Sequence, residues 1–343
     1  MKVLIYDMGC AGGDIRYPIK EAFETLGHQV SMFDWQNYMY SASAPGLVSR
    51  VKDRFFFCRV AKRINSALMG FIEAGGYDFM LVSRGDHIFP ETILKAKAYI
   101  PVIVNWSTDD VFNTLQSTKY LRDSFDKYDC IFSPRGHLRE EYLSRGAKSF
   151  EVLDWYYRLG LLYPAPDPAP VKYEHEIAFV GSWSPRREKI LAALEGLNVS
   201  VFGWGWNKKT PRNFFARERC RPFIDMKGMH DVFASTMINL NILTIENRDT
   251  TNLRNFEIPA AGGFQLSERS REIGKLFRED QEIVCFGDND ELRNKCEYYL
   301  ANKQKRQNIA LAGYHRLVSG NHSIVDRVKQ ITDKVEAMMK RCP

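Results

Sequence analysis

The sequence predicts an α/β protein of two domains, each built on a parallel sheet. Three observations lead to this fold class. The chain has 343 residues, about twice the size of an ordinary domain. Short apolar runs alternate with amphipathic segments in both halves, the pattern of βαβ units. Prolines 164, 166, 168 and 170 lie between the halves and favour a stiff, extended connection.

The first half contains five expected strands separated by helical segments. The strands are expected at 2–7, 28–34, 77–83, 101–106 and 129–133. One helix should run from after Asp14 to Gly27, and a long one from about residue 47 to 73. Such alternation produces parallel sheets through right-handed crossovers. We therefore expect residues 1–155 to form a Rossmann-like domain.

The second half repeats the alternation after an expected linker at 156–173. Its strands are expected at 176–180, 199–202, 237–243, 263–266 and 282–286. Residues 288–340 are rich in helix formers and should give three helices, broken near Asn302 and Gly320. The sequence thus predicts a second Rossmann-like domain at 174–320. The terminal helix, 321–343, is expected to pack back across the linker.

Composition excludes several protein classes. Hydrophobic residues make up 45% and charged residues 26% of the chain, values close to those of globular proteins. No apolar run approaches the ~20 residues of a membrane span, and the first apolar run is too short for a signal peptide. The seven cysteines are scattered, so neither a disulfide framework nor a structural zinc is expected. We expect a cytoplasmic protein.

The net charge of +6 is concentrated in one stretch. Residues 184–221 carry nine basic and three acidic residues. A patch of this kind can attract a phosphate-bearing ligand, a nucleic acid or an anionic membrane. A solvated loop is the alternative interpretation.

Two glycine-rich turns each follow an expected strand and open a helix. The first includes Gly12, Gly13 and Asp14, and the second runs from Gly181 and Ser182 to Arg186 and Arg187. Glycines allow a ligand close to the backbone, and helix N-termini offer unpaired N–H groups to anions. Two guanidinium groups there also suit a diphosphate. A tight turn without a ligand and surface arginines are the alternatives.

The segment 249–264 is the most informative. Glu257 lies inside a largely apolar run, 256–266, where a carboxylate must be paired or meet a ligand. Its two oxygens suit the vicinal diol of a ribose. A structural ion pair with Arg254 explains the residue equally well.

The same segment carries a family resemblance. Asn239-Leu-Asn241, Asn255-Phe-Glu257-Ile-Pro-Ala-Ala-Gly-Gly-Phe, Glu282-Ile-Val, Asp290-Glu-Leu, Tyr298-Tyr-Leu and Ala312-Gly resemble the C-terminal domain of CgeB-type (spore-maturation-like) glycosyltransferases. The first half is similar more loosely, through Arg84-Gly-Asp86, residues 90–94 and residues 106–110. The resemblance implies the GT-B architecture, in which two Rossmann-like domains face a central cleft with their parallel sheets.

The resemblance also implies a donor site in the second domain. Transferases of group 1 carry two Glu residues separated by seven intervening residues, and here the pair becomes Asp249 and Glu257. Glu257 would bind the ribose, the Asp249 end of the loop would face the sugar, and the Gly181 turn would hold the pyrophosphate. The expected donor residues are Gly181, Ser182, Arg186, Arg187, Gly203, Trp204, Asn241, Asp249, Asn252, Arg254 and Glu257. Trp204 and Trp206 could instead pack in the core.

These features predict a metal-independent glycosyltransferase that uses a nucleotide sugar as co-substrate and needs no further cofactor. The acceptor would be a hydroxyl of a glycan, a protein or a small molecule, bound near Gly12 and Gly13. Inversion would require a carboxylate base. The candidates are Asp14, Asp86, Asp109 and Asp110, although each could equally cap a helix. Retention would need no such base.

Two alternatives stay open: a non-catalytic nucleotide-sugar-binding protein, and a glycosyltransferase that modifies nucleic acid. The D-x-D sequence at Asp288 to Asp290 could suggest a metal. Because Glu291 follows three residues after Asp288, we interpret it as a helix cap and expect no metal site.

A basic and aromatic segment lies within the helix expected at 47–73. Its basic residues are Arg50, Lys52, Arg54, Arg59, Lys62 and Arg63, and its aromatic residues are Phe55, Phe56 and Phe57. It could attach peripherally to an anionic membrane or to nucleic acid. A solvated helix face is the simpler interpretation.

Overall fold

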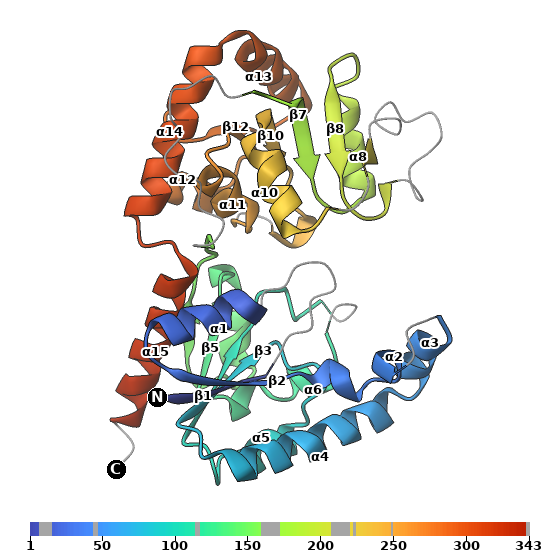
Figure 1. The fold of residues 1–343 in the computed structure, drawn as a ribbon, viewed down its shortest axis with the longest axis vertical. Helices are drawn as coiled ribbons and strands as arrows, with labels where there is room; N and C mark the ends of the chain where they lie inside the picture. Colours follow the sequence, from blue (N-terminus) through green and yellow to red (C-terminus); the bar gives the residue numbers. More distant parts are fainter. Residues whose placement is uncertain are drawn as a thin grey trace. The chain divides into compact units, whose positions relative to one another are not determined.

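The computed structural model describes residues 1–6, 16–43, 47–113, 117–158, 172–206, 220–221, 224–247 and 250–340. The chain divides into two units, shown in Figure 1. Unit 1 contains Met1–Asp154 and Ile324–Pro343, and unit 2 contains Trp155–Ser323. The division falls beside residue 155. Most of the expected linker, residues 159–171, lies outside the described residues.

Unit 1 is built on a six-stranded sheet in the order β2-β1-β3-β4-β5-β6. Its strands are β1 (Lys2–Tyr6), β2 (Gln29–Phe33), β3 (Phe79–Ser83), β4 (Val102–Trp106), β5 (Cys130–Ser133) and β6 (Phe150–Val152). Every neighbouring pair is parallel. The five expected strands are confirmed. The three-residue edge strand β6 was not expected, because so short a run gives little periodicity.

Helices cover the sheet of unit 1. They are α1 (Arg16–Thr25), α2 (Tyr40–Ser43), α3 (Leu47–Phe55), α4 (Phe57–Gly75), α5 (Pro90–Ala96), α6 (Lys119–Arg122), α7 (Arg139–Ser144) and α15 (Ile324–Met339). Three 3-10 turns, η1 (Trp35–Tyr38), η2 (Phe125–Lys127) and η3 (Gly136–Leu138), lie between them. Helix α15 comes from the end of the chain and packs mainly on α1 (Figure 1).

The prediction of one helix over 47–73 was wrong in one respect. The segment forms two helices, α3 and α4, which are separated at Phe56. Helix α4 buries Val60, Ile64 and Leu68 on one face, and it ends at Gly76, whose φ of 59° is left-handed. The apolar face of α4 therefore packs against the core, whereas the described apolar side chains of α3 stay exposed.

Unit 2 repeats the architecture with a sheet in the order β12-β11-β10-β7-β8-β9. Its strands are β7 (His175–Val180), β8 (Val199–Phe202), β9 (Cys220–Arg221), β10 (Thr236–Asn241), β11 (Gln265–Glu268) and β12 (Val284–Phe286). All neighbouring pairs are again parallel. The five expected strands are confirmed within two residues at most boundaries. The two-residue strand β9 was not expected.

The helices of unit 2 are α8 (Pro185–Ala192), α10 (Met226–Ala234), α11 (Arg254–Ala260), α12 (Arg271–Leu276), α13 (Asn289–Ala301) and α14 (Lys303–Ser319), with the 3-10 turn η6 (Ile245–Asn247). Helices α13 and α14 meet at Asn302, and α14 ends at Gly320 before α15 begins. Three helices after residue 288 are therefore confirmed. None of the described helices has the length and apolar character needed to cross a lipid bilayer.

Candidate functional site

The carboxyl ends of β7, β10 and β11 lie at one edge of the unit 2 sheet, because these strands are parallel. An asparagine network fixes the loop above this edge. Asn241 and Asn252 exchange two side-chain hydrogen bonds of 2.9 and 3.0 Å. The Asn252 backbone N–H also donates to Oδ1 of the buried Asn255, at 3.0 Å. Asn241 and Asn252 therefore hold the turn that leads into α11.

Glu257 lies on α11 and is 8% exposed. Its Oε2 accepts a hydrogen bond from Nη1 of Arg254. Arg254 also donates from Nε to the Val180 carbonyl at the end of β7, at 3.2 Å, and its guanidinium lies 5.6 Å from the Phe233 ring. Among the residues that the structure describes, Oε1 of Glu257 has no hydrogen-bond partner. Within the described residues, one of the two carboxylate oxygens of Glu257 thus has a hydrogen-bond partner and the other has none.

A pocket of about 260 Å³, part of it open to solvent, lies against Glu257. Its lining residues are Tyr157, Arg158, Met229, His230, Phe233, Glu257 and Ala260. The ion pair with Arg254 is therefore confirmed, and Glu257 also lines an opening; its binding of a ribose stays a prediction.

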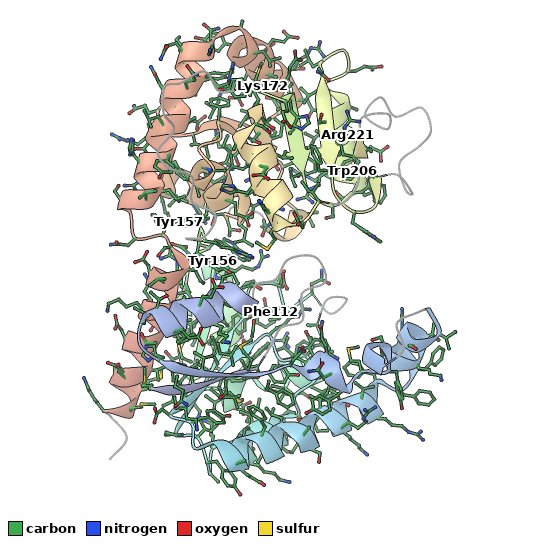
Figure 2. The ribbon with its side chains drawn as sticks, viewed as in Figure 1. Phe112, Tyr156, Tyr157, Lys172, Trp206 and Arg221 are labelled. Atoms are coloured by element: carbon green, nitrogen blue, oxygen red, sulfur yellow. The ribbon has the colours of Figure 1, made fainter. Side chains whose placement is uncertain are left out.

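Gly181 and Gly203 bring the loops after β7 and β8 into close contact. Gly203 has a φ of 139°, and a Cβ there would collide with the Gly181 carbonyl. Trp206 is buried, donates from Nε1 to the same carbonyl at 2.8 Å and packs on Phe179 (Figure 2). The core interpretation is confirmed for Trp206, whereas Trp204 is largely exposed.

The two arginines after Ser184 have different surroundings. Arg187 is buried, and its guanidinium donates to the Ile242 carbonyl at 2.8 Å and to the Ser182 carbonyl at 3.0 Å. It therefore connects the segments that follow β7 and β10. Arg186 is more exposed and pairs with Glu268 while donating to the Leu243 carbonyl at 2.9 Å. A diphosphate role stays a prediction, with Arg186 better placed than Arg187.

In unit 1, Arg84 gathers two of the predicted bases. It follows β3 with a φ of 65°, pairs through Nε with Asp86, and lies 2.5 Å through Nη1 from Oδ2 of Asp109. Burial opposes its charge, but the two carboxylates outweigh burial and raise the pKa of Arg84. Asp86 also accepts from the Thr118 backbone N–H at 3.1 Å. The side chain of Asp109 is 41% exposed and that of Asp86 19%.

Asp110 caps a turn next to this cluster. Its Oδ1 accepts from the backbone N–H of Phe112 at 3.1 Å. Asp110 therefore stabilises a local turn and Asp86 accepts from a distant backbone N–H, and neither is the N-cap of a described helix. Asp109 is the least constrained of the three carboxylates.

Comparison with known proteins bears on the unit 2 site. Residues 186–333 match the sequence profile of the glycosyl transferase-like family. This part of the chain, less than half of its length, is similar to that family. It contains α11, Glu257 and Arg254. No curated protein sequence matches the chain.

Solved structures share the fold of the whole chain. Sucrose-phosphate synthase from Thermosynechococcus elongatus aligns with a TM-score of 0.69 at 11% identity, covering 99% of this chain and 100% of that one. HepE from Anabaena, solved with UDP-glucose, gives 0.64 at 11% identity, with 98% and 100% covered. Trehalose-6-phosphate synthase gives 0.63 at 13% identity, with 98% and 99% covered.

These likenesses confirm the α/β class and the GT-B fold. The family match over residues 186–333 supports a glycosyltransferase. Membership of the CgeB-type subfamily stays a prediction. Several predicted site residues lie outside the described residues: Gly12, Gly13, Asp14, Asp249 and the basic residues of 207–219.

Some residues that line the unit 2 pocket were not predicted from the sequence. His230 lies on α10, which Asp225 caps by accepting from the Gly228 N–H at 2.8 Å. Tyr157 and Arg158 come from the segment before the prolines (Figure 2). The adjacent aromatic residues Tyr156 and Tyr157 indicate a segment that packs against a domain. From the sequence, we used them only to place the boundary between the two domains.

The D-x-D sequence forms a helix cap. Asp288 accepts from the Glu291 backbone N–H at 2.8 Å, and Glu291 in turn accepts from the Gly287 N–H at 2.7 Å. The capping interpretation is therefore confirmed. Throughout the described ranges, no group of three His, Cys, Asp or Glu side chains gathers as a metal ion would require.

Proposed function

We propose that this chain transfers a sugar from a nucleoside-diphosphate donor to a hydroxyl acceptor. Unit 2 would hold the donor and unit 1 the acceptor. The observation that carries the proposal is the Glu257 carboxylate at the wall of the unit 2 pocket. It lies within the family-matched residues and on the carboxyl side of the sheet, where ligands of open α/β folds bind.

The ribose of the donor would bind at Glu257. Arg254 occupies Oε2 and fixes the carboxylate, while Oε1 has no partner among the described residues. Each carboxylate oxygen can accept more than one hydrogen bond, so two vicinal hydroxyls can both donate to it. The Met229 and Phe233 side chains give the pocket an apolar wall for the nonpolar faces of the nucleoside.

The diphosphate would interact with Arg254 and Arg186. Departure of a nucleoside diphosphate builds up negative charge, which fixed guanidinium groups stabilise. Arg254 is held by Val180 and Phe233, so it needs little reorganisation. This arrangement supports transfer without a metal ion, as the sequence predicts.

We favour transfer with retention of the anomeric configuration. Trehalose-6-phosphate synthase, which shares the fold, was analysed for glycosyl transfer with retention. The unit 1 carboxylates Asp86 and Asp109 both accept hydrogen bonds from Arg84, so each has an oxygen that is already engaged within unit 1. They would instead hold Arg84 in place beside the acceptor, which we expect to be a glycan, a protein or a small molecule.

Calorimetric titration with a panel of nucleoside diphosphates and nucleotide sugars tests the proposal. One nucleoside diphosphate should bind, and Glu257→Ala should weaken it about 100-fold, because two hydrogen bonds to a charged group are lost. Glu272→Ala, an exposed Glu on α12, is the matched control and should bind like the wild type. Absence of binding by every nucleoside diphosphate would overturn the proposal.

Donor turnover separates the enzyme from its alternatives. The proposed enzyme hydrolyses the bound nucleotide sugar slowly or transfers it to an added acceptor mixture. Binding with neither reaction would favour a non-catalytic nucleotide-sugar-binding protein. Transfer to DNA or RNA, with a steep dependence of binding on salt, would favour a nucleic-acid acceptor.

A further inference from the structure

Helix α3 of unit 1 presents an apolar stripe to solvent. Val48 and Phe55 are 69% and 81% exposed, and Val51 lies between them on the same face. Phe56, at the break before α4, is also exposed. Helix α3 packs mainly on α2 and α4 and stands at the end of α4 away from the sheet (Figure 1). The stripe therefore has no place in the core of unit 1.

Basic side chains surround this stripe. Lys52 and Arg54 are exposed on α3, and Arg59, Lys62 and Arg63 are exposed on the first turns of α4. None of these five side chains forms an ion pair within the described part of the chain. The guanidinium of Arg59 lies over the Phe56 ring, 5.2 Å from its centre, so charge and apolar surface are in direct contact.

The one acidic residue between positions 47 and 72 does not offset this charge at the surface. Asp53 is buried, and its carboxylate accepts from the backbone N–H groups of Tyr40 and Ser41 at 2.6 and 3.1 Å. These bonds attach α3 to α2 and orient α3 so that Asp53 faces inward. The opposite face, with Val48, Val51 and Phe55, then faces outward.

We propose that α3 and the first turns of α4 form a docking surface for an anionic lipid bilayer. An apolar stripe flanked by lysine and arginine is the pattern of a helix that lies in the interface of a membrane. The apolar side chains would enter the boundary between headgroups and acyl chains, and the five basic groups would meet the lipid phosphates. The charge of the surface is thus complementary to that of the bilayer.

The apolar part of the surface favours lipid over nucleic acid. Phosphate contacts need only the basic groups, and aliphatic side chains such as Val48 and Val51 offer neither hydrogen bonds nor stacking to bases. A bilayer uses both components of the surface. This inference is independent of the proposed sugar transfer, since it concerns unit 1 helices that contain none of the proposed donor or acceptor residues.

Co-sedimentation of the full chain with vesicles tests the inference. The wild type should sediment with vesicles of phosphatidylcholine mixed with phosphatidylglycerol, but not with pure phosphatidylcholine, and salt should weaken the binding. Lys52→Glu combined with Arg54→Glu should weaken partitioning at least about 20-fold, since each basic residue near the surface contributes roughly five-fold. Val48→Ser combined with Phe55→Ser should weaken it at low and at high salt.

The matched controls lie on α5 of the same unit. Leu94→Ser and Lys95→Glu replace exposed residues of the same types outside the surface and should leave vesicle binding unchanged. Hydrogen exchange of the wild type, which needs no substitution, should show protection of peptides from 47–59 and none of peptides from 90–96 when vesicles are added. Failure to bind the mixed vesicles, equal losses in the control variants, or binding to duplex DNA alone would overturn the inference.

Discussion

Each unit places an arginine–carboxylate group at the carboxyl edge of its sheet, but the two groups differ in burial. In unit 1, Arg84 serves two carboxylates, and the Asp109 side chain is 41% exposed. In unit 2, Arg254 serves Glu257, whose side chain is 9% exposed and lines a pocket. Exposed pairs contribute little to stability, whereas breaking a buried pair is costly. Burial thus distinguishes the partly exposed cluster of unit 1 from the buried carboxylate at the proposed ligand site of unit 2.

The glycines beneath these groups give the largest expected effect. Gly203→Ala in unit 2 should cost about 3 kcal/mol, because its φ is unfavourable for alanine and its Cβ would meet the fixed Gly181 carbonyl. Gly85→Ala in unit 1 should cost about 2 kcal/mol, since its φ of 96° is also unfavourable for alanine but its Cβ would meet the side chains of Val82 and Tyr128 and no backbone atom. Urea unfolding followed by circular dichroism compares them. A larger loss for Gly85→Ala would reverse the comparison.

The next largest difference is expected between Arg254 and Arg84, in the stability that is lost when each is replaced. Arg254→Met leaves the Glu257 charge unpaired and should destabilise the protein by about 2 kcal/mol, a value reduced from that of a fully buried pair because Arg254 is partly exposed. Arg84→Met should cost about 1 kcal/mol or less, since water solvates the freed carboxylates. A double-mutant cycle of Arg254→Met with Glu257→Gln measures the coupling. If the losses in unfolding free energy of the two single variants add up in the double variant, the ion pair contributes nothing to stability.

The unit 1 carboxylates should affect turnover only modestly. With retention, Asp109→Asn should lower kcat less than about tenfold, because it removes a partner of Arg84 and no proton acceptor. Asp110→Asn, which retains an acceptor for the Phe112 N–H, is the control. A fall in kcat of about 100-fold or more, with an inverted product anomer by NMR, would instead identify Asp109 as a catalytic base.

The smallest effect concerns the partly exposed Glu291, at the start of α13 just after β12. The pKa of Glu291 is lowered from 4.5 to about 2, chiefly by the hydrogen bond that its carboxylate accepts from Arg269. A lowered pKa stabilises the fold above pH 4.5, and this contribution disappears as the pH falls toward about 2. Glu291→Gln should lose at most about 1 kcal/mol near neutral pH.

Thermal unfolding of Glu291→Gln at several pH values checks this dependence. The difference from the wild type should shrink below pH 4.5, where the wild-type carboxylate begins to lose its advantage. Asp290→Asn, on the same turn of α13 and without an ion pair in the described residues, should show no such pH dependence. If the difference in thermal stability between Glu291→Gln and the wild type does not change with pH, the effect of the substitution comes from helix capping.

Much of the fold could be predicted because strand and helix periodicity are local. The runs that became β3 and β4 are buried on both faces and needed no distant contact to be recognised. The candidate site was predicted less completely. Glu257 and Arg254 were found because a charge inside an apolar run is conspicuous, whereas the lining role of His230 depends on the packing of α10 beside α11.

By itself, the sequence determined two α/β domains, the three helices after residue 288, the cap at Asp288 and the unusual position of Glu257. These follow from hydrophobic period, turn residues and the cost of burying a charge, all of which are written in neighbouring residues. Tertiary structure decided that Arg187 faces inward, that Glu257 has Arg254 on one side and a pocket on the other, and that the stripe on α3 stays exposed. Each depends on which distant segment comes to lie against a side chain, and no local pattern encodes that.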